Sequence, residues 1–398
     1  MHVTSEVKIP QQQAINRKFE CKKSGYVCIS SYLKNVTITS GPTVALEKLE
    51  LLLKKGAISK DIDTHALAHT IGRQTAEHFG SNSNSFLMCP MFLFIGGCQH
   101  GFFQYVLGKG KSTVESANKL CQNIEEDKKT QKLTSLCYHG IGHGLTMMYE
   151  YDLKKAIGVC DKLNPGSARF NCWLGAYMEI LNSEANGFIN SEYFSKTDPY
   201  KPCDMFDGRR SYACFTYIPY YLLSFYKGSV IHAVHSCQYA PKQKSREACS
   251  IGFGVLFSLP HWLQEKNDST KNVPKEAIKK CQLFNKSRLR GFCWEGALRN
   301  LFNANYPHVK DNAIYFCKNT PDYYQKQCFE SIIFQIQIQT NSSKERLYQC
   351  QSLPLRYNLH CIIASANMKW LALLYFKFAT SHNLYLIEDT VYNMLIAN

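Results

Sequence analysis

The sequence predicts an all-α fold made of disulfide-stapled αα-hairpins that repeat along the chain, and two observations carry this prediction. Seven pairs of neighbouring cysteines each enclose 10 to 15 residues. The second cysteine of each pair recurs at intervals of 35, 42, 35, 44, 35 and 33 residues, a period typical of helical-repeat proteins. The pairs are Cys121/Cys137, Cys160/Cys172, Cys203/Cys214, Cys237/Cys249, Cys281/Cys293, Cys317/Cys328 and Cys350/Cys361. Such units stack into a curved solenoid or close into an α/α toroid, and the sequence leaves both open.

Residues 271–302 show how one unit is built. Val273–Lys280 has the pattern of a helix, Gln282–Arg288 is a polar loop, and a second helix is expected to begin near Arg290 and to carry Cys293. A disulfide would then join the end of the first helix to the start of the second, and closing a loop of this size stabilises the fold by about 3 kcal/mol in the entropy model. The same pattern fits residues 154–182, 230–258, 312–338 and 344–366.

Two further positions recur in register with the second cysteine. Glycine stands three residues after it at Gly101, Gly140, Gly175, Gly252 and Gly296. Arginine stands three or four residues before it at Arg169, Arg210, Arg246 and Arg290. Because glycine inside a helix costs about 0.5–1 kcal/mol relative to alanine, its repeated use predicts close contact between helices. The arginines are expected to bond loop carbonyls or acidic neighbours.

The pattern weakens towards both ends, which divides the chain into three segments. The first unit is degenerate, with helices expected at Val44–Lys55 and Ile62–Phe79 ahead of the Cys89/Cys98 pair. The C-terminal segment lacks cysteines and contains the apolar stretch Trp370–Phe378. The segments are an N-terminal arm or cap at 1–42 with Cys21/Cys28, a single repeat domain at 43–363 with a histidine-rich part at 61–150, and a C-terminal tail or capping helix at 364–398.

Cysteine usage indicates an oxidising compartment. All 18 cysteines fall into neighbouring pairs. The sequence contains no Cys-x2-Cys pair, the spacing typical of a zinc site. A secreted or lumenal protein is therefore expected, although residues 1–30 hold no apolar run typical of a signal peptide, so the expectation is that this chain does not carry one. No segment reaches the roughly 18 apolar residues of a transmembrane helix. Four N-glycosylation sequons, at Asn35, Asn267, Asn285 and Asn341, are compatible with a glycoprotein.

The formal net charge of +15 comes from scattered lysines and arginines. Such scatter is typical of a solvated surface, and an acidic glycan or an anionic surface remains open as a partner. Nucleic acid is not expected as a partner in a compartment that forms disulfides.

Histidines carry the main chemical signal in the sequence. His65 and His69 are four residues apart on one expected helix, and His139 and His143 are four apart on another. Residues with this spacing share one helix face about 5–6 Å apart, which suits two ligands of one metal ion. The alternative is that these are ordinary buried histidines with hydrogen-bonding partners.

The repeat register adds a fifth histidine to this group. His100 follows Cys98 by two residues, as His139 follows Cys137, so both should face the same way in consecutive units. Two later units carry leucine or isoleucine at this position, Leu174 and Ile251, and another carries Glu295, so the fold itself does not require histidine there. Glycines 140, 142 and 144 would clear space beside the imidazoles for a ligand or for the helix of His65 and His69, or would serve tight packing between hairpins.

These residues predict a metal centre in the N-terminal third of the chain. Nitrogen ligands favour Cu, Fe or Zn over Mg or Ca. Glu150 and Glu179 are the candidates for a general base or an additional ligand. The sequence thus predicts a secreted metal-dependent enzyme, an oxidoreductase or a hydrolase, and leaves a second class open: a non-catalytic extracellular scaffold that binds a protein or a glycan.

Overall fold

The fold is all-α, as the sequence predicts. The structure is a computed structural model, and no strand occurs in the part of the chain that it describes. That part comprises residues 25–59, 62–90, 93–110, 112–126, 131–185, 192–259, 273–303, 309–339 and 343–366.

The chain begins with an irregular group of helices and continues as regular hairpins. The first group is α1 (Tyr26–Lys54), α2 (Thr64–Phe79), α3 (Ser83–Leu87), the 3-10 turn η1 (Leu93–Gly96) and α4 (Gly97–Val106). Each hairpin that follows has an A helix and a B helix. In chain order they are α5 (Val114–Glu126) and α6 (Gln131–Met148), α7 (Leu153–Cys160) and α8 (Ser167–Ala185), α9 (Lys201–Asp204) and α10 (Gly208–Phe225), α11 (Val230–Gln238) and α12 (Gln243–Phe257), α13 (Val273–Cys281) and α14 (Ser287–Asn303), α15 (Val309–Asn319) and α16 (Asp322–Gln339), and α17 (Ser343–Gln351) and α18 (Leu355–Ala366).

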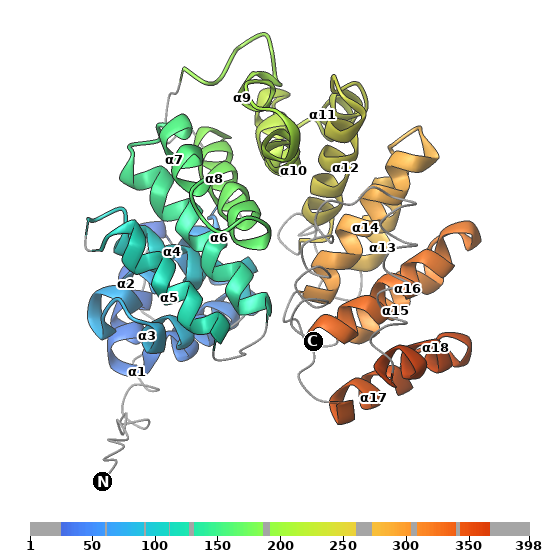
Figure 1. Cartoon of the computed structure of the whole chain (residues 1–398), viewed down its shortest axis with the longest axis horizontal. Coiled ribbons are helices and arrows are strands. Elements are labelled where there is room, and N and C mark those ends of the chain that lie inside the picture. The colour runs from blue at the N-terminus through green and yellow to red at the C-terminus, as the bar shows by residue number, and fades with distance from the viewer. Residues whose placement is uncertain are drawn as a thin grey trace.

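The hairpins stack side by side into a curved array. Each B helix packs against the B helices before and after it, from α4 to α18, and each A helix packs on the B helix of its own hairpin. Figure 1 shows the array following an arc, with α1–α3 at one end and α17–α18 at the other. Helices α6 and α16 also contact each other across the arc. The B helices therefore line the inner side of the curve, and one apolar core runs through the array from Ala76 to Ala364.

The disulfide prediction is confirmed for all seven regular pairs and for the degenerate first unit. Each bond joins an A helix, or the segment that replaces it, to the following B helix, and most of the first cysteines stand near the end of the A helix, whereas Cys121 stands in the middle of α5. The bonds are Cys89–Cys98, Cys121–Cys137, Cys160–Cys172, Cys203–Cys214, Cys237–Cys249, Cys281–Cys293, Cys317–Cys328 and Cys350–Cys361. Cys28 is also disulfide-bonded, and its predicted partner Cys21 lies outside the described residues.

The recurring arginines do both things expected of them. Arg290 donates to the carbonyl of Phe284 at 3.2 Å in the loop between α13 and α14, and Arg169 and Arg246 bond the equivalent loop carbonyls. Arg210 instead pairs with Asp161 at 3.3 Å. Helix α14 begins at Ser287, three residues before the start that the sequence predicted near Arg290.

The recurring glycines bring neighbouring B helices unusually close. A Cβ atom on Gly175 of α8 would overlap the carbonyl of His139 on α6, and one on Gly142 of α6 would overlap the carbonyl of Cys172 on α8. The contact is therefore reciprocal, with one glycine from each helix at the crossing. The same reciprocal arrangement joins α2 to α4 through Gly72 and Gly101, and α12 to α14 through Gly254 and Gly296. Close helix contact, predicted from the repeated glycine, is confirmed.

The two ends of the array differ in how much of them is described. The expected border at residue 42 falls inside α1, where Gly41 has a φ of 85° and Pro42 follows. Ile29 and Leu33, before this kink, are buried in a small core with α2. The apolar stretch Trp370–Phe378 of the predicted tail lies outside the described residues.

Candidate metal centre

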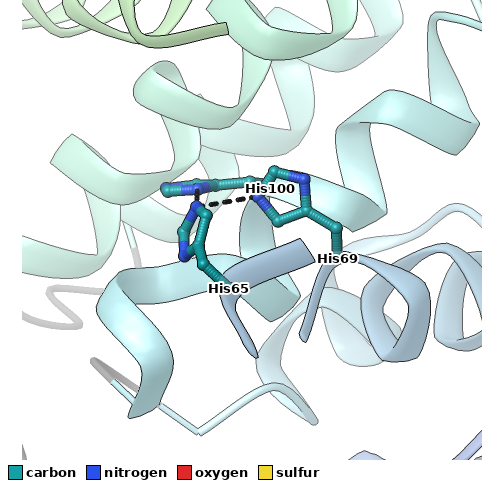
Figure 2. Close-up of side chains that lie close together, drawn as sticks. All are labelled: His65, His69 and His100. Carbon is teal, nitrogen blue, oxygen red and sulfur yellow. Dashed lines mark hydrogen bonds between the residues drawn. The ribbon is translucent and has the colours of Figure 1, made fainter. Parts of the chain in front are cut away.

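Five buried histidines from three helices meet on the inner side of the array. His65 and His69 come from α2, His100 from α4, and His139 and His143 from α6. Their side chains form two groups in which one ring nitrogen from each residue lies within 4.8 Å of those of the other two: His65, His69 and His100, and His100, His139 and His143. Figure 2 shows the first group, with the three rings pointing toward one another from α2 and α4.

Local structure fixes where each histidine stands. The Asp63 side chain caps the start of α2 by accepting from the backbone N–H groups of His65 and Ala66, which sets the first turn of the helix. His69 follows one turn later on the same face. On α4, His100 follows the disulfide-bonded Cys98 by two residues. The glycine crossings between α2 and α4 then hold the two helices close enough for these rings to touch.

The first group has a defined hydrogen-bond arrangement around His65. The Nε2 atoms of His65 and His69 are 2.9 Å apart, and Nδ1 of His100 is 3.3 Å from Nε2 of His65. Nδ1 of His65 lies 2.7 Å from the carbonyl oxygen of Phe94. Because a carbonyl only accepts, Nδ1 must carry the proton, and the lone pair of Nε2 points into the cluster. Phe94 holds this carbonyl in place with a φ of 50°, a strained value for a non-glycine residue.

The second group is oriented in the same way, but by a carboxylate. Nδ1 of His143 is 2.6 Å from Oε2 of Glu179, so Nε2 faces His139, whose Nε2 is 3.2 Å away. The same Glu179 oxygen accepts from Nε2 of Gln104 at 2.9 Å, and Arg73 donates to Oε1 of Gln104 at 2.7 Å. A chain of hydrogen bonds from Arg73 to His143 thus positions one imidazole, an arrangement typical of metal-bound histidines.

Burial lowers the pKa of four of these imidazoles and so favours their neutral form. Loss of solvent lowers the pKa of His69, His100 and His139 well below the usual value for histidine, and neighbouring histidines lower it further. The pKa of His65 is also lowered, mainly by burial. A neutral imidazole is the form that binds a metal ion.

The nitrogen spacings match those of metal ligands. The N–N separations of 2.9, 3.2 and 3.3 Å compare with about 2.9–3.4 Å for two nitrogens bound to one ion at about 2.0–2.1 Å with angles between 90° and 109°. In the part of the chain that the structure describes, no carboxylate belongs to either group. The arrangement can therefore hold a transition-metal ion through nitrogen alone.

Of the two glutamates expected near the site, only Glu179 lies beside the histidines. Glu179 on α8 is buried and bonds His143. It contacts the nitrogen that faces away from the other histidines, so it orients the His143 ring rather than facing the middle of the cluster. Glu150 is exposed in the turn after α6, with a φ of 50°, and does not join the cluster.

The three glycines of α6, at positions 140, 142 and 144, allow neighbouring helices to pack closely. A Cβ atom on Gly140 or Gly144 would meet α4 at Phe103, and one on Gly142 would meet α8. The expectation that they admit a ligand or the helix of His65 and His69 is therefore wrong, and packing between hairpins, the alternative, is confirmed.

Sequence reasoning missed three contributors to the site. Arg73 stands one turn after His69 on α2, so extending the helical spacing by four residues would have found it. Tyr217 on α10 lies 6.0 Å from His139 between ring centroids, and burial raises its pKa. Phe94 acts through its backbone carbonyl, for which the sequence holds no signal.

Replacing Glu179 tests whether this carboxylate supports the centre. We expect Glu179→Gln to weaken metal binding by about 10- to 100-fold, the effect typical of losing a partner of a metal-bound histidine. Glu150→Gln, which removes the same charge from an exposed turn, should leave the affinity unchanged. Competitive titration of both variants against a chromophoric chelator measures the difference, and equal affinities would show that Glu179 plays no part.

The fold and the site together define a disulfide-stapled helical-repeat protein with a buried cluster of histidines. No protein-family model matches the chain, and no curated protein or solved structure shows significant similarity to it. Within the described ranges, no helix is long and apolar enough to cross a membrane.

Proposed function

We propose that the histidine cluster is a transition-metal centre and that the protein is a metal-dependent oxidoreductase of an oxidising compartment. The observation that carries the proposal is the convergence of five buried imidazoles, two of which are held with their Nε2 atoms directed into the cluster. Cu, Fe and Zn all suit such ligands, and a redox-active ion such as Cu or Fe would supply electron-transfer chemistry.

The fold alone gives no reason for histidines at these positions. Leu174 and Ile251 are buried at the register position of His100 and His139 in later units, so an apolar side chain satisfies the packing. Burying several imidazoles removes polar nitrogens from water, which is unfavourable unless they gain partners. A metal ion held by either group of three histidines would satisfy the lone pairs that face one another in that group.

The carboxylates favour oxidoreductase over hydrolase. A general base close to the metal-bound water assists hydrolysis at many metal centres. Glu179 is engaged with the outward nitrogen of His143 and with Gln104, and Glu150 is exposed away from the cluster. Hydrolysis is therefore the weaker of the two reaction classes, and the near-complete burial of the imidazoles favours a small substrate.

The disulfides support secretion or residence in a lumenal compartment. Eight bonds are formed among the described residues, one in each hairpin unit, and such density is typical of oxidising environments. The sequon residue Asn285 is exposed in the loop between α13 and α14, where a glycan would not disturb the core.

Removing two ligands tests the proposal. Wild-type protein, purified in its oxidised form, should carry Cu, Fe or Zn by elemental analysis. The variant His139→Ala/His143→Ala should carry less metal than wild type because it lacks one pair of nitrogens. His232→Ala/His235→Ala is the matched control, since these two histidines are exposed on α11. Metal at background level in wild-type protein that has been offered each ion would contradict the proposal and favour the binding scaffold.

A further inference from the structure

The cluster is divided into two overlapping sets of ligands. His65 and His69 lie on one side, His139 and His143 on the other, and His100 is the one residue common to both groups. Among the ring contacts of these five residues, only those of His100 reach all four of the others, at centroid distances of 5.2, 5.4, 4.8 and 4.3 Å from His65, His69, His139 and His143. His100 is therefore central to the cluster, and the rings of His69 and His143 also lie 5.6 Å apart.

One ion cannot use both pairs well. Two nitrogens on the same ion lie at most about 4.2 Å apart when each bond is about 2.0–2.1 Å long. Each group of histidines whose ligand nitrogens all lie close together has three members, and the described residues contain no larger group of this kind. Each set of three, however, suits an ion that keeps an open position for a small ligand.

Each pair also has its own orienting partner. The Phe94 carbonyl fixes the ring of His65 on one side, and the Glu179 carboxylate fixes the ring of His143 on the other. If only one ion were held, one of these two supports would serve a histidine outside the coordination sphere. Two independently supported pairs are the arrangement expected for two ions.

His100 can serve both ions only as a bridge. Each ring nitrogen has one lone pair for a metal, so binding two ions requires Nδ1 for one and Nε2 for the other, with the ring deprotonated. Nδ1 faces the first pair, 3.3 Å from Nε2 of His65. The ring stacks on that of His143, 14° from parallel, so it must turn as the second ion binds for Nε2 to face that ion. The N–H proton of His100 passes to solvent as the second ion binds, and no electron is transferred.

We infer that the cluster holds two metal ions bridged by the imidazolate of His100, one bound by His65 and His69 and the other by His139 and His143. This inference rests on the proposed metal centre and states its nuclearity. The imidazolate and Glu179 each supply a negative charge that offsets part of the charge of the two ions.

Copper titration of the wild-type protein tests the bridge without any variant. The metal-free, oxidised protein is titrated with Cu²⁺, and bound copper and the integrated electron paramagnetic resonance signal are measured on the same samples. We expect two equivalents, one for each group of histidines, and a signal well below that of the bound copper, because imidazolate couples the two spins. Binding of one equivalent would overturn the bridge and leave the metal centre intact, whereas no binding would overturn both.

Two pair variants then locate the ions. His65→Ala/His69→Ala and His139→Ala/His143→Ala should each bind one equivalent with full signal intensity, because each keeps one pair together with His100. Two equivalents with full intensity in the wild type would place the second ion elsewhere and would overturn the inference. Circular dichroism of the disulfide-intact variants separates loss of a ligand from loss of fold, and the wild-type result stands even if a variant unfolds.

Discussion

Gly175→Ala is expected to destabilise the protein by about 3 kcal/mol or more, at or beyond the upper end of typical overpacking effects. The added Cβ would overlap the backbone carbonyl of His139 at the crossing of α8 and α6. A backbone carbonyl cannot rotate away as a side chain can, so the two helices must move apart. The movement would displace His139 and would separate Glu179 from His143, so metal affinity should fall together with stability.

Gly158→Ala is the matched control for this substitution. Gly158 lies within α7, and an added Cβ would meet nothing within 4 Å. The change should be neutral or stabilise the protein by up to about 1 kcal/mol, because alanine favours helix. Chemical denaturation with the disulfides intact compares the two variants. Equal free energies of unfolding would show that the close crossing is not required.

The metal-free protein is expected to lose stability steeply as the pH falls below 6.5. The folded-state pKa values of His69, His100 and His139 lie well below 6.5, mainly because the rings are buried. Between the folded and unfolded pKa values the unfolded chain binds more protons, so stability decreases as the pH is lowered. Each histidine contributes at most about 1.4 kcal/mol per pH unit, so the three together approach about 4 kcal/mol per pH unit.

Denaturation of the metal-free protein at pH 7.5, 6.5, 6.0 and 5.5 measures this slope. The charged groups around the cluster are Asp63 and Glu179, whose charges favour protonation of His65, and Arg73, which disfavours protonation of His69. The exposed-histidine variant His232→Ala/His235→Ala should keep the wild-type slope. Unchanged stability across this range would mean that the imidazoles accept protons without leaving the cluster.

Most of the fold could be predicted because it depends on cysteines and glycines that recur at regular intervals along the chain. Cysteine spacing gave the hairpins and their disulfides, and the position of Gly175 three residues after Cys172 indicated a close crossing. What could not be predicted is which helix lies on the other side of a given glycine. Gly142 packs on α8, and nothing in the local sequence distinguishes that neighbour from α2.

The residues of the site that could be predicted are those placed by helical spacing and by their position in the repeat. The two i,i+4 pairs and the register position of His100 were sufficient to bring five side chains together, because the units stack in chain order. Which of Glu150 and Glu179 lies at the cluster depends on where α6 ends and on which side of α8 packs against α6. Both are determined by packing between hairpins, which the local sequence does not specify. The Phe94 carbonyl is a backbone group, whose direction depends on φ and ψ rather than on residue type.

Anomalous X-ray scattering from crystals of the metal-loaded protein tests the central claim most directly. The data are collected at the absorption edge of the metal found by elemental analysis, so that only that element gives the signal. We predict two peaks, one between His65, His69 and His100 and the other between His100, His139 and His143. Five ordered histidines with no peak among them, in protein that has been offered Cu, Fe and Zn, would contradict the account.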